Sequence, residues 1–279
     1  MKIKFKCDEC GQGYAVDPSA AGKEANCVCG HLITVPRHVA EVEVTQTATS
    51  GEVARYERIN AQLRNERGVP IFPSKLWGPD EKDVTLRTPQ EVANRIFPLQ
   101  AVSIRGEGIP LEELWSEFLP REKVWPHATP EERRFLSEPR PDPDEARDLV
   151  WRLESIWVLV WALGHLPELP WPDAMCDTHK LMSIICPARD DPSFVRNARL
   201  RDKREILDMR EMTMRLSWAI TDAYLNHRQI PANLDWINPS EWVDAAPTMV
   251  GRLCQERHLA LNWLVRFGDA DWDDVDTPT

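Results

Sequence analysis

Two short stretches near the start of the chain, Cys7-Asp8-Glu9-Cys10-Gly11 and Cys27-Val28-Cys29-Gly30, decide the fold of the first thirty residues. Each stretch brings two thiols close together and follows them with a glycine, which lets the backbone bend beneath the sulfurs. Four thiolates from two such turns, here called knuckles, form the tetrahedral ligand set of a structural zinc site, with zinc–sulfur distances of about 2.3 Å. The sequence therefore predicts one structural Zn²⁺ ion, bound by Cys7, Cys10, Cys27 and Cys29.

Two alternatives accompany this site. A Cys-x-x-Cys pair also occurs in redox proteins, although a second pair nearby favours a structural metal. The second knuckle has a single residue, Val28, between its cysteines, and this tight spacing leaves open whether Cys29 or the neighbouring His31 completes the site. A structural zinc site keeps all four positions filled by protein and performs no chemistry itself.

Strand-like segments flank the two knuckles. Ile3-Lys4-Phe5-Lys6 alternates apolar and basic residues, and Leu32-Ile33-Thr34-Val35 is a second β-type run closed by Pro36. Residues 1–36 are therefore predicted to form a small β zinc ribbon. Residues 37–51 end in the small and polar stretch Thr45-Gln46-Thr47-Ala48-Thr49-Ser50-Gly51, which predicts a flexible linker.

Residues 52–279 show helical periodicity and no run of alternating residues, which predicts a larger all-α helical domain. The pattern Thr-Pro-x-Glu at Thr88 and again at Thr129 marks two helix starts, with threonine as the cap and glutamate as its partner. Asp142-Pro143 marks a third start, and the longest apolar helix is expected to run from there to Gly164. Because apolar residues surround this helix on all sides near its end, we expect it to lie buried at the centre of the domain.

The composition is that of a globular protein in a reducing compartment. The 279 residues are 42% hydrophobic and 28% charged, and the seven cysteines are too scattered for a disulfide framework. The longest uncharged apolar run, 156–164, is far shorter than the roughly 20 residues of a membrane helix, and the N-terminus has no signal-peptide core. We therefore expect a cytoplasmic protein that does not enter a membrane. The net charge of −11 disfavours non-specific binding to nucleic acid.

The order of features in the first 36 residues is distinctive. A lysine-rich first strand leads to the first knuckle, an Ala-Gly-Lys turn at 21–23 leads to the second, and the segment ends in Val35-Pro36. In this order the segment resembles the short bacterial zinc-ribbon modules of the four-cysteine type. The single residue inside the second knuckle, where two are usual, is a departure from that pattern. The resemblance implies one structural zinc ion and fixes no function.

A second resemblance covers nearly all of residues 52–279. The stretches that carry it are 86–93, 151–154, 159–164, 205–208, 256–264 and 272–275, together with Arg215, Trp218 and Ala219. Through their order and spacing this region resembles the bacterial domain-of-unknown-function family 4272. The resemblance implies a mostly helical domain and brings no assigned activity.

Three lysines of the first strand, Lys2, Lys4 and Lys6, share one face beside the aromatic residues Phe5 and Tyr14. Lysines on phosphates and an aromatic ring on a base would form a nucleic-acid contact. The ribbon and its closing residues, 1–37, hold only five Lys and Arg against four Asp and Glu, however. Lysines also protect the edge of a strand from pairing. The solvated strand edge is therefore the favoured interpretation, with nucleic-acid binding as the alternative.

Two other groups of residues are interpreted as structural. Cys176, His179 and Cys186 suggest a second metal site or a Cys–His nucleophile, but no third, orienting group is identified, and a helix cap with buried thiols explains the same residues. The aspartates of the tail 269–276 alternate as in a calcium loop, but the required glycine and glutamate are missing. Trp272 is expected to dock this tail on the helical domain.

Six charged residues lie among apolar residues of three predicted helices: Arg152, Glu154, Asp208, Arg215, Glu256 and Arg257. Buried charge is costly unless it is paired. We therefore expect these residues to form a buried ion-pair network, which is the favoured interpretation, or to converge on a polar pocket, where any chemistry would be sought.

The sequence contains no phosphate-binding glycine loop, nucleophile elbow or zinc-protease motif, and no catalytic residue is assigned. The favoured hypothesis is a non-enzymatic adaptor, in which a tethered ribbon binds a partner protein while the helical domain binds another ligand or partner. The alternative is an enzyme of unknown reaction, with a pocket built by the charged residues and the ribbon as a targeting module.

Overall fold

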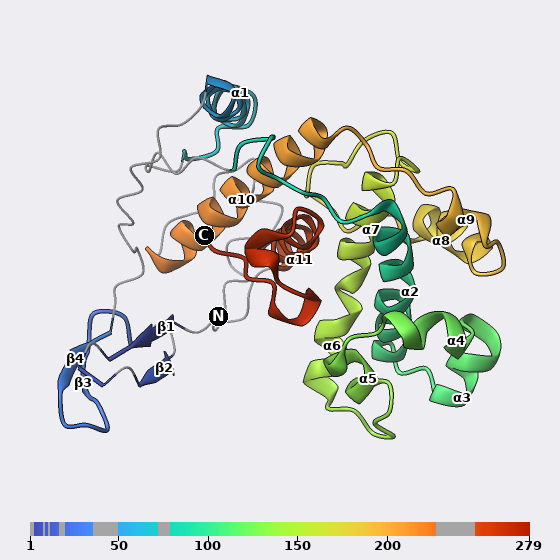
Figure 1. Ribbon diagram of the computed structural model, residues 1–279, viewed down its shortest axis with the longest axis horizontal. Helices are drawn as coiled ribbons and strands as arrows, with labels where there is room; N and C mark the ends of the chain where they lie inside the picture. Colours follow the sequence, from blue (N-terminus) through green and yellow to red (C-terminus); the bar gives the residue numbers. More distant parts are fainter. Residues whose placement is uncertain are drawn as a thin grey trace. The chain divides into compact units, whose positions relative to one another are not determined.

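The chain folds into two compact units, residues 1–47 and residues 48–279. The computed structural model describes residues 3–7, 9–10, 12–16, 20–35, 50–71, 79–226 and 249–279 (Figure 1). The first unit is a small β ribbon and the second is a helical body, as the sequence predicted. The predicted linker, 37–51, lies outside the described residues except for Ser50 and Gly51, which form the start of the first helix.

The ribbon consists of two antiparallel hairpins. β1 (Ile3–Lys6) pairs with β2 (Gly13–Val16), and β3 (Glu24–Asn26) pairs with β4 (Leu32–Thr34). In the first hairpin Phe5 lies directly opposite Tyr14, and in the second Ala25 lies opposite Ile33. Two-stranded hairpins with strands this short are not stable alone in water. The ribbon therefore needs a further source of stability.

Glycines in the left-handed region shape the second hairpin. Gly22 and Gly30 have φ angles of 74° and 87°, which cost little for a residue without a Cβ. The Gly22 N–H donates to the Val35 carbonyl at 2.8 Å, and the Gly30 N–H donates to the Cys27 carbonyl at 2.9 Å. The chain thus turns sharply at the second knuckle and returns along β3 as β4.

The described residues of the body are mainly helical. Its longer helices are α1 (Ser50–Arg67), α2 (Pro89–Gly106), α6 (Pro143–Val150), α7 (Arg152–Ala162), α8 (Thr178–Ala188), α10 (Lys203–Leu225) and α11 (Met249–Leu264). Shorter elements are α3 (Leu111–Glu113), α4 (Arg121–Val124), α5 (Pro130–Phe135) and α9 (Ser193–Arg196), a π-helical turn at Leu114–Phe118, and 3₁₀ turns at Trp125–His127, Phe267–Asp269 and Trp272–Asp274. Of the helices described, none has the length and apolar character needed to cross a membrane.

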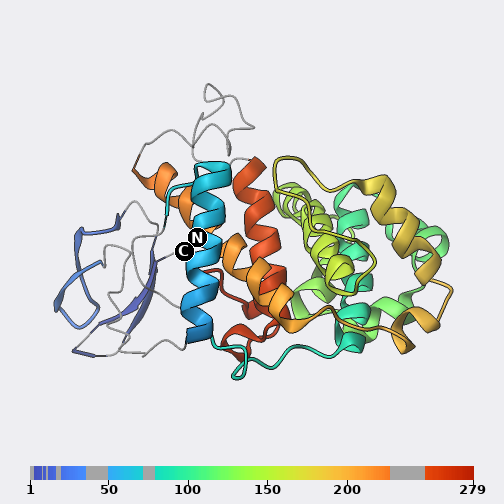
Figure 2. The same ribbon diagram turned by 90° about the horizontal axis from the view of Figure 1, so that it is seen from above.

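Four helices form the centre of the body and pack in the order α10, α11, α7 and α2. α1 packs against α10, and α6 packs against α2 (Figure 1, Figure 2). The largest apolar cluster lies between α2, α7 and α11, where Ile96, Leu159 and Leu261 are fully buried. A second cluster joins α1 to α10 through Ile59 and Leu216. The body thus contains large apolar clusters, whereas the cluster described in the ribbon has three buried side chains.

α7 lies in the interior of the body, as its sequence predicted. Every residue from Glu154 to Ala162 is buried, including Trp157 and Trp161, because α2 and α11 both pack on this helix. An apolar surface on all sides of a helix is stable only where neighbouring elements cover it. The position of α7 therefore follows directly from its composition.

The third predicted helix is in fact two helices, α6 and α7, so the expectation of one continuous helix was wrong. The N–H groups of Trp151 and Glu154 donate to carbonyls only three residues back, which breaks the α-helical pattern between them. On α2, the Ser103 hydroxyl donates to the Val150 carbonyl at 3.2 Å, and a Cβ at Gly106 would stand 2.6 Å from a carbonyl of α6. Close packing of α6 on α2 therefore accompanies the break, and periodicity within the segment does not reveal it.

Both Thr-Pro-x-Glu signals form capping boxes, which confirms the predicted helix starts. The Glu91 N–H donates to Thr88 Oγ1 at 3.2 Å, and the Glu132 N–H donates to Thr129 Oγ1 at 3.2 Å. Each glutamate carboxylate in turn accepts from the backbone N–H of its threonine. Asp142 caps the start of α6. These reciprocal bonds satisfy N–H groups that a helix start leaves without partners.

Candidate functional site

The four cysteines of the two knuckles meet at one point of the ribbon. Their Sγ atoms lie within 4.8 Å of one another, and no other such metal-binding group of His, Cys, Asp or Glu occurs in the described parts of the chain. The sulfurs of Cys7 and Cys29 are 3.9 Å apart, and those of Cys10 and Cys27 are 3.4 Å apart. Four sulfurs at about 2.3 Å from a central zinc stand about 3.8 Å from one another. The donor set and its spacing therefore fit one metal ion.

Short backbone turns hold these sulfurs in place. The Cys7 N–H donates to the Gln12 carbonyl at 2.9 Å, and the Cys27 N–H donates to the His31 carbonyl at 2.8 Å, so each hydrogen bond closes one knuckle. Each of the two close sulfur pairs joins one knuckle to the other, which ties the hairpins together. The cluster contains Cys29 and not His31, whose side chain is exposed.

Electrostatics within the cluster favour a bound cation. Hydrogen bonds from the Cys29 backbone and from the Tyr14 hydroxyl lower the pKa of Cys27 to about 6. The Gln12 backbone acts to lower the pKa of Cys10, but hydrogen bonds shared with Cys27 and Cys29 outweigh it and raise that pKa to about 12. One thiolate thus forms readily and its neighbour resists ionisation, because the hydrogen bond between the two sulfurs favours the charged form of Cys27 and the neutral form of Cys10. A divalent cation among the sulfurs would supply the charge that lets all four ionise.

Tyr14 contacts the cluster from the first hairpin. Its hydroxyl donates to Cys27 Sγ at 3.0 Å and accepts the Val28 N–H at 3.0 Å. The sequence places Tyr14 beside the lysines of β1 and gives no signal of a contact with the cysteines. The alternating pattern of the strands places it opposite Phe5, but its contact with Cys27 joins the two hairpins and depends on the tertiary structure.

In the body, the six charged residues occupy three places. The first lies between α7 and α11, where Arg152 Nη1 donates to both carboxylate oxygens of Glu256, at 2.7 and 3.0 Å. The Ser155 hydroxyl donates to Glu256 Oε2 at 2.7 Å. The Glu256 carboxylate is therefore held by a charged and a neutral donor, and it has little capacity left for another partner.

A second ion pair joins the same two helices and is almost completely buried. Arg257 Nε donates to Glu154 Oε2 at 2.9 Å, with the two side chains 3% and 1% exposed. Arg257 also donates to the Pro170 carbonyl at 2.7 Å, and Glu154 Oε1 accepts the Cys176 N–H. A buried pair is tolerated when additional hydrogen bonds satisfy its remaining donors and acceptors, as they do here. Four of the six predicted residues thus lie together between α7 and α11.

The other two predicted residues lie elsewhere on α10. Asp208 Oδ1 accepts from Arg55 Nε at 3.2 Å and from Arg58 Nη2 at 2.7 Å, which links α10 to α1. Arg215 is buried, pairs with Glu211 one turn earlier on α10, and lies 4.2 Å from the centre of the Tyr56 ring. The structure therefore does not bring Asp208 and Arg215 to the charges between α7 and α11.

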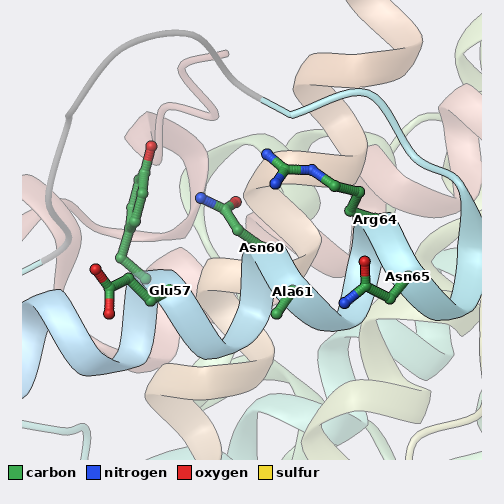
Figure 3. Close-up of a pocket in the computed structure, with 6 residues that line it drawn as sticks. Glu57, Asn60, Ala61, Arg64 and Asn65 are labelled. Atoms are coloured by element: carbon green, nitrogen blue, oxygen red, sulfur yellow. The ribbon is translucent and has the colours of Figure 1, made fainter.

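Two hollows in the described part of the body can be compared with the predicted polar pocket. A cavity of about 30 Å³ adjoins Arg152, and its other lining residues are Glu131, Glu132, Glu145, Leu149, Trp272 and Asp273. This is room for about one water molecule. A larger hollow of about 340 Å³ follows α1 and is lined by Tyr56, Glu57, Asn60, Ala61, Arg64 and Asn65 (Figure 3). None of the six predicted charged residues lines the larger hollow.

The group around α8 is a helix cap with separate thiols. The predicted helix cap is Asp177, which accepts the Lys180 N–H at 2.9 Å at the start of α8. Cys176 is buried as expected, but Cys186 is exposed, so the expectation of two buried thiols was wrong for Cys186; His179 is exposed as well. These residues form no metal-binding group among the parts of the chain that the structure describes.

Trp272 docks the C-terminal tail on the body, as predicted. Its side chain is buried, its ring lies 5.3 Å from that of Trp263 at an angle of 67°, and the Arg95 guanidinium lies 4.4 Å from its ring centre. Neighbouring aspartates such as Asp271 remain exposed. The tail is therefore anchored by this aromatic side chain, together with hydrogen bonds such as that from Asn262 Nδ2 to the Asp276 carbonyl at 2.8 Å.

Comparison with known proteins identifies the family to which the helical body belongs. Residues 55–275 match a family model described as Domain of unknown function (DUF4272). No zinc-ribbon family matches the N-terminal residues, and neither a curated protein nor a solved structure gives a significant match. Because the matched residues make up most of the chain, this protein belongs to the DUF4272 family.

Proposed function

We propose that this protein is a zinc-binding adaptor without catalytic activity, in which the ribbon contacts a partner protein and the helical body contacts a second ligand or partner. The observation that carries the metal assignment is the group of four sulfurs within 4.8 Å of one another. Four thiolates in a tetrahedron are typical of zinc, and a site filled by protein ligands has no open position for a substrate. Such a site also needs reduced thiols, so we place the protein in the cytoplasm.

Metal analysis of the freshly purified full chain tests the zinc assignment. We expect native mass spectrometry to show one zinc ion per chain. Cys10→Ser removes an exposed ligand, and we expect it to lose the ion. Cys186→Ser removes an exposed thiol of α8 and serves as the matched control, which we expect to keep it. A wild-type protein without zinc, or an ion retained equally by both variants, would contradict the assignment.

Exposed apolar side chains beside the metal site support an interaction role for the ribbon. Val28 is 82% exposed and Leu32 is 53% exposed. Val28 lies between two of the cysteines, so a bound metal would hold it in a fixed position at the surface. A contiguous exposed apolar patch is typical of a contact surface for another protein, and we propose that Val28 and Leu32 contribute to one.

Affinity capture followed by cross-linking tests the adaptor role. We expect the full chain to capture a protein that cross-links to the ribbon, and Val28→Ser/Leu32→Ser to lose it. Met175→Ser removes a similarly exposed apolar side chain from the body, 46% exposed, and is expected to retain the partner. Equal capture by the two variants, or cross-links to the body alone, would speak against a ribbon-mediated contact.

The two alternative functions have less support. An enzyme with a charged pocket requires carboxylates that are available to a substrate, whereas Glu154 and Glu256 are both engaged by arginines. A ribbon that binds nucleic acid requires the lysines of β1. Lys2 lies outside the described residues, as do the side chains of Lys4 and Lys6, and the net charge of −11 opposes such binding.

A further inference from the structure

Tyr14 is held rigidly on the first hairpin. It lies on β2 directly opposite Phe5 of β1, and the two rings stack with their centres 5.6 Å apart and an angle of 27° between their planes. Both rings are half-buried and pack against a cluster of three buried side chains, Cys7, Cys27 and Ile33. The position of the Tyr14 hydroxyl is therefore fixed by the packing of its ring.

The hydroxyl of Tyr14 is oriented as a donor to sulfur. Its oxygen accepts the Val28 N–H at 3.0 Å, and Cys27 Sγ lies 3.0 Å away on its other side. A hydroxyl has a single hydrogen to donate. With the backbone amide already donating to the oxygen, that hydrogen is directed at Cys27 Sγ. The bond spans the two hairpins, because Tyr14 belongs to β2 and Cys27 follows β3.

We propose that Tyr14 is a positioning residue of the metal centre, and that its O–H···S hydrogen bond to Cys27 orients this ligand and tunes the metal–sulfur bond. The inference rests on the proposed zinc site and extends it beyond the four cysteines. Four thiolates and one Zn²⁺ ion carry a net charge of −2, so a hydrogen-bond donor to one sulfur disperses negative charge without adding a cation. Groups that hydrogen-bond to metal ligands commonly control both the orientation of the ligand and the strength of its bond.

The same contact distinguishes Cys27 from the other ligands. Cys7 and Cys27 are 2% and 4% exposed, whereas Cys10 and Cys29 are exposed. Tyr14 donates to the sulfur of a residue that is only 4% exposed, where water has little access to replace a lost hydrogen bond. Removal of the hydroxyl is therefore expected to have a measurable effect at the metal.

Tyr14→Phe in the full chain tests the proposal, because phenylalanine keeps the ring and its stacking on Phe5 and removes only the hydroxyl. Tyr224→Phe is the matched control, since it removes the same group from α10. Competition between Co²⁺ and Zn²⁺ gives the zinc Kd, and the sulfur-to-cobalt charge-transfer band reports the electron density on the thiolates. We expect Tyr14→Phe to raise the zinc Kd by roughly 10–100-fold and to shift the band to lower energy, and Tyr224→Phe to change neither.

The outcomes separate this inference from the proposed metal site. A wild-type protein that binds no metal would overturn both. A wild-type protein that binds one metal, with Kd and band unchanged in Tyr14→Phe, would overturn the role of Tyr14 alone. If Tyr14→Phe fails to form a four-sulfur cobalt site, Phe5→Leu decides the cause, because it removes the stacking partner and keeps the hydroxyl. Loss of the site in Tyr14→Phe only would support the proposal, and loss in both would assign the effect to ring packing and overturn it.

Discussion

The ribbon and the helical body are stabilised in different ways. The apolar cluster described in the ribbon consists of Cys7, Cys27 and Ile33, with Phe5 and Tyr14 packed against them, so two of its buried residues are also candidate metal ligands. In the body, a large apolar cluster extends over α2, α7, α8 and α11, and buried ion pairs lie beside it. The comparison leads us to expect that a bound metal supplies stability that burial alone does not supply in the ribbon, whereas the body is stabilised by its apolar clusters.

The largest expected effect is the loss of ribbon structure on metal removal. Structural zinc in small domains contributes apparent binding free energies of about 10–16 kcal/mol at neutral pH, and the short hairpins have little else to hold them. A strong chelator is therefore expected to collapse the dispersed amide resonances of the ribbon in a heteronuclear NMR spectrum. All 12 tryptophans lie in the second unit and Tyr14 is the only tyrosine of the first, so tryptophan fluorescence reports the body alone.

Two results would contradict the expected difference in metal dependence between the two units. Ribbon resonances that stay dispersed after complete metal removal would show that the hairpins are stable alone. A large change in tryptophan fluorescence would show that the body also depends on the metal. Cys27→Ser is expected to reproduce the effect of the chelator, and Cys254→Ser, a buried cysteine of α11, is expected to leave the ribbon spectrum unchanged.

A smaller effect, within the body, is expected from breaking its most buried ion pair. Glu154→Leu leaves the Arg257 guanidinium buried without its charged partner, and removal of one member of such a pair typically costs about 3–5 kcal/mol. Urea unfolding followed by tryptophan fluorescence measures the loss. The double variant Glu154→Leu/Arg257→Met buries no charge and is expected to recover most of the stability. A double variant as unstable as the single one would attribute the loss to packing or to the Cys176 N–H.

Much of the fold could be predicted from the sequence because the relevant signals are local. The knuckles place thiols within a few residues of one another, and the capping boxes at Thr88 and Thr129 join residues three positions apart. The burial of α7 follows from its own composition. In each case the interacting groups belong to a single turn or helix, so their spacing along the chain determines the structure.

The features that could not be predicted depend on contacts between elements. The break between α6 and α7 accompanies the close packing of α6 on α2, which the absence of a Cβ at Gly106 allows. Charge and burial singled out Glu154 and Asp208 alike, but their partners, Arg257 and Arg55, are set by which helices pack together. The hydroxyl of Tyr14 reaches Cys27 only because the two hairpins meet at the knuckles. Composition indicates that such groups need partners and does not identify them.

An intermediate effect is expected from pH, through a buried histidine of α11. His258 is fully buried, both of its ring nitrogens lack a hydrogen-bond partner, and its pKa falls to about 3 because burial and the nearby Arg210 charge disfavour protonation. The unfolded chain takes up a proton on this histidine below about pH 6.5, whereas the folded chain does not. The free energy of unfolding should therefore fall as the pH drops through this range, by about 2 kcal/mol between pH 7 and pH 5.

Urea unfolding at several pH values tests this contribution. His258→Gln removes the titrating group and is expected to flatten the pH dependence over this range, whatever its effect at pH 7. His179→Gln changes an exposed histidine of α8 and is expected to keep the slope of the wild type. If His258→Gln and the wild type lose stability in parallel as the pH falls, acid sensitivity of the body arises from other groups.

The smallest expected effect comes from Asp208, one of the six predicted charged residues, whose ion pairs are partly exposed to solvent. Asp208 is 26% exposed and joins α10 to Arg55 and Arg58 of α1. Asp208→Asn keeps the shape of the side chain and removes its charge, and ion pairs that solvent reaches are typically worth less than about 1 kcal/mol. We expect a loss of that size in low salt, and a smaller one in 1 M salt, where the charges are screened. If Asp208→Asn lowers the free energy of unfolding as much as Glu154→Leu does, burial does not determine which charges stabilise the body. The difference in stabilisation between the ribbon and the body would then be attributed to the apolar core alone.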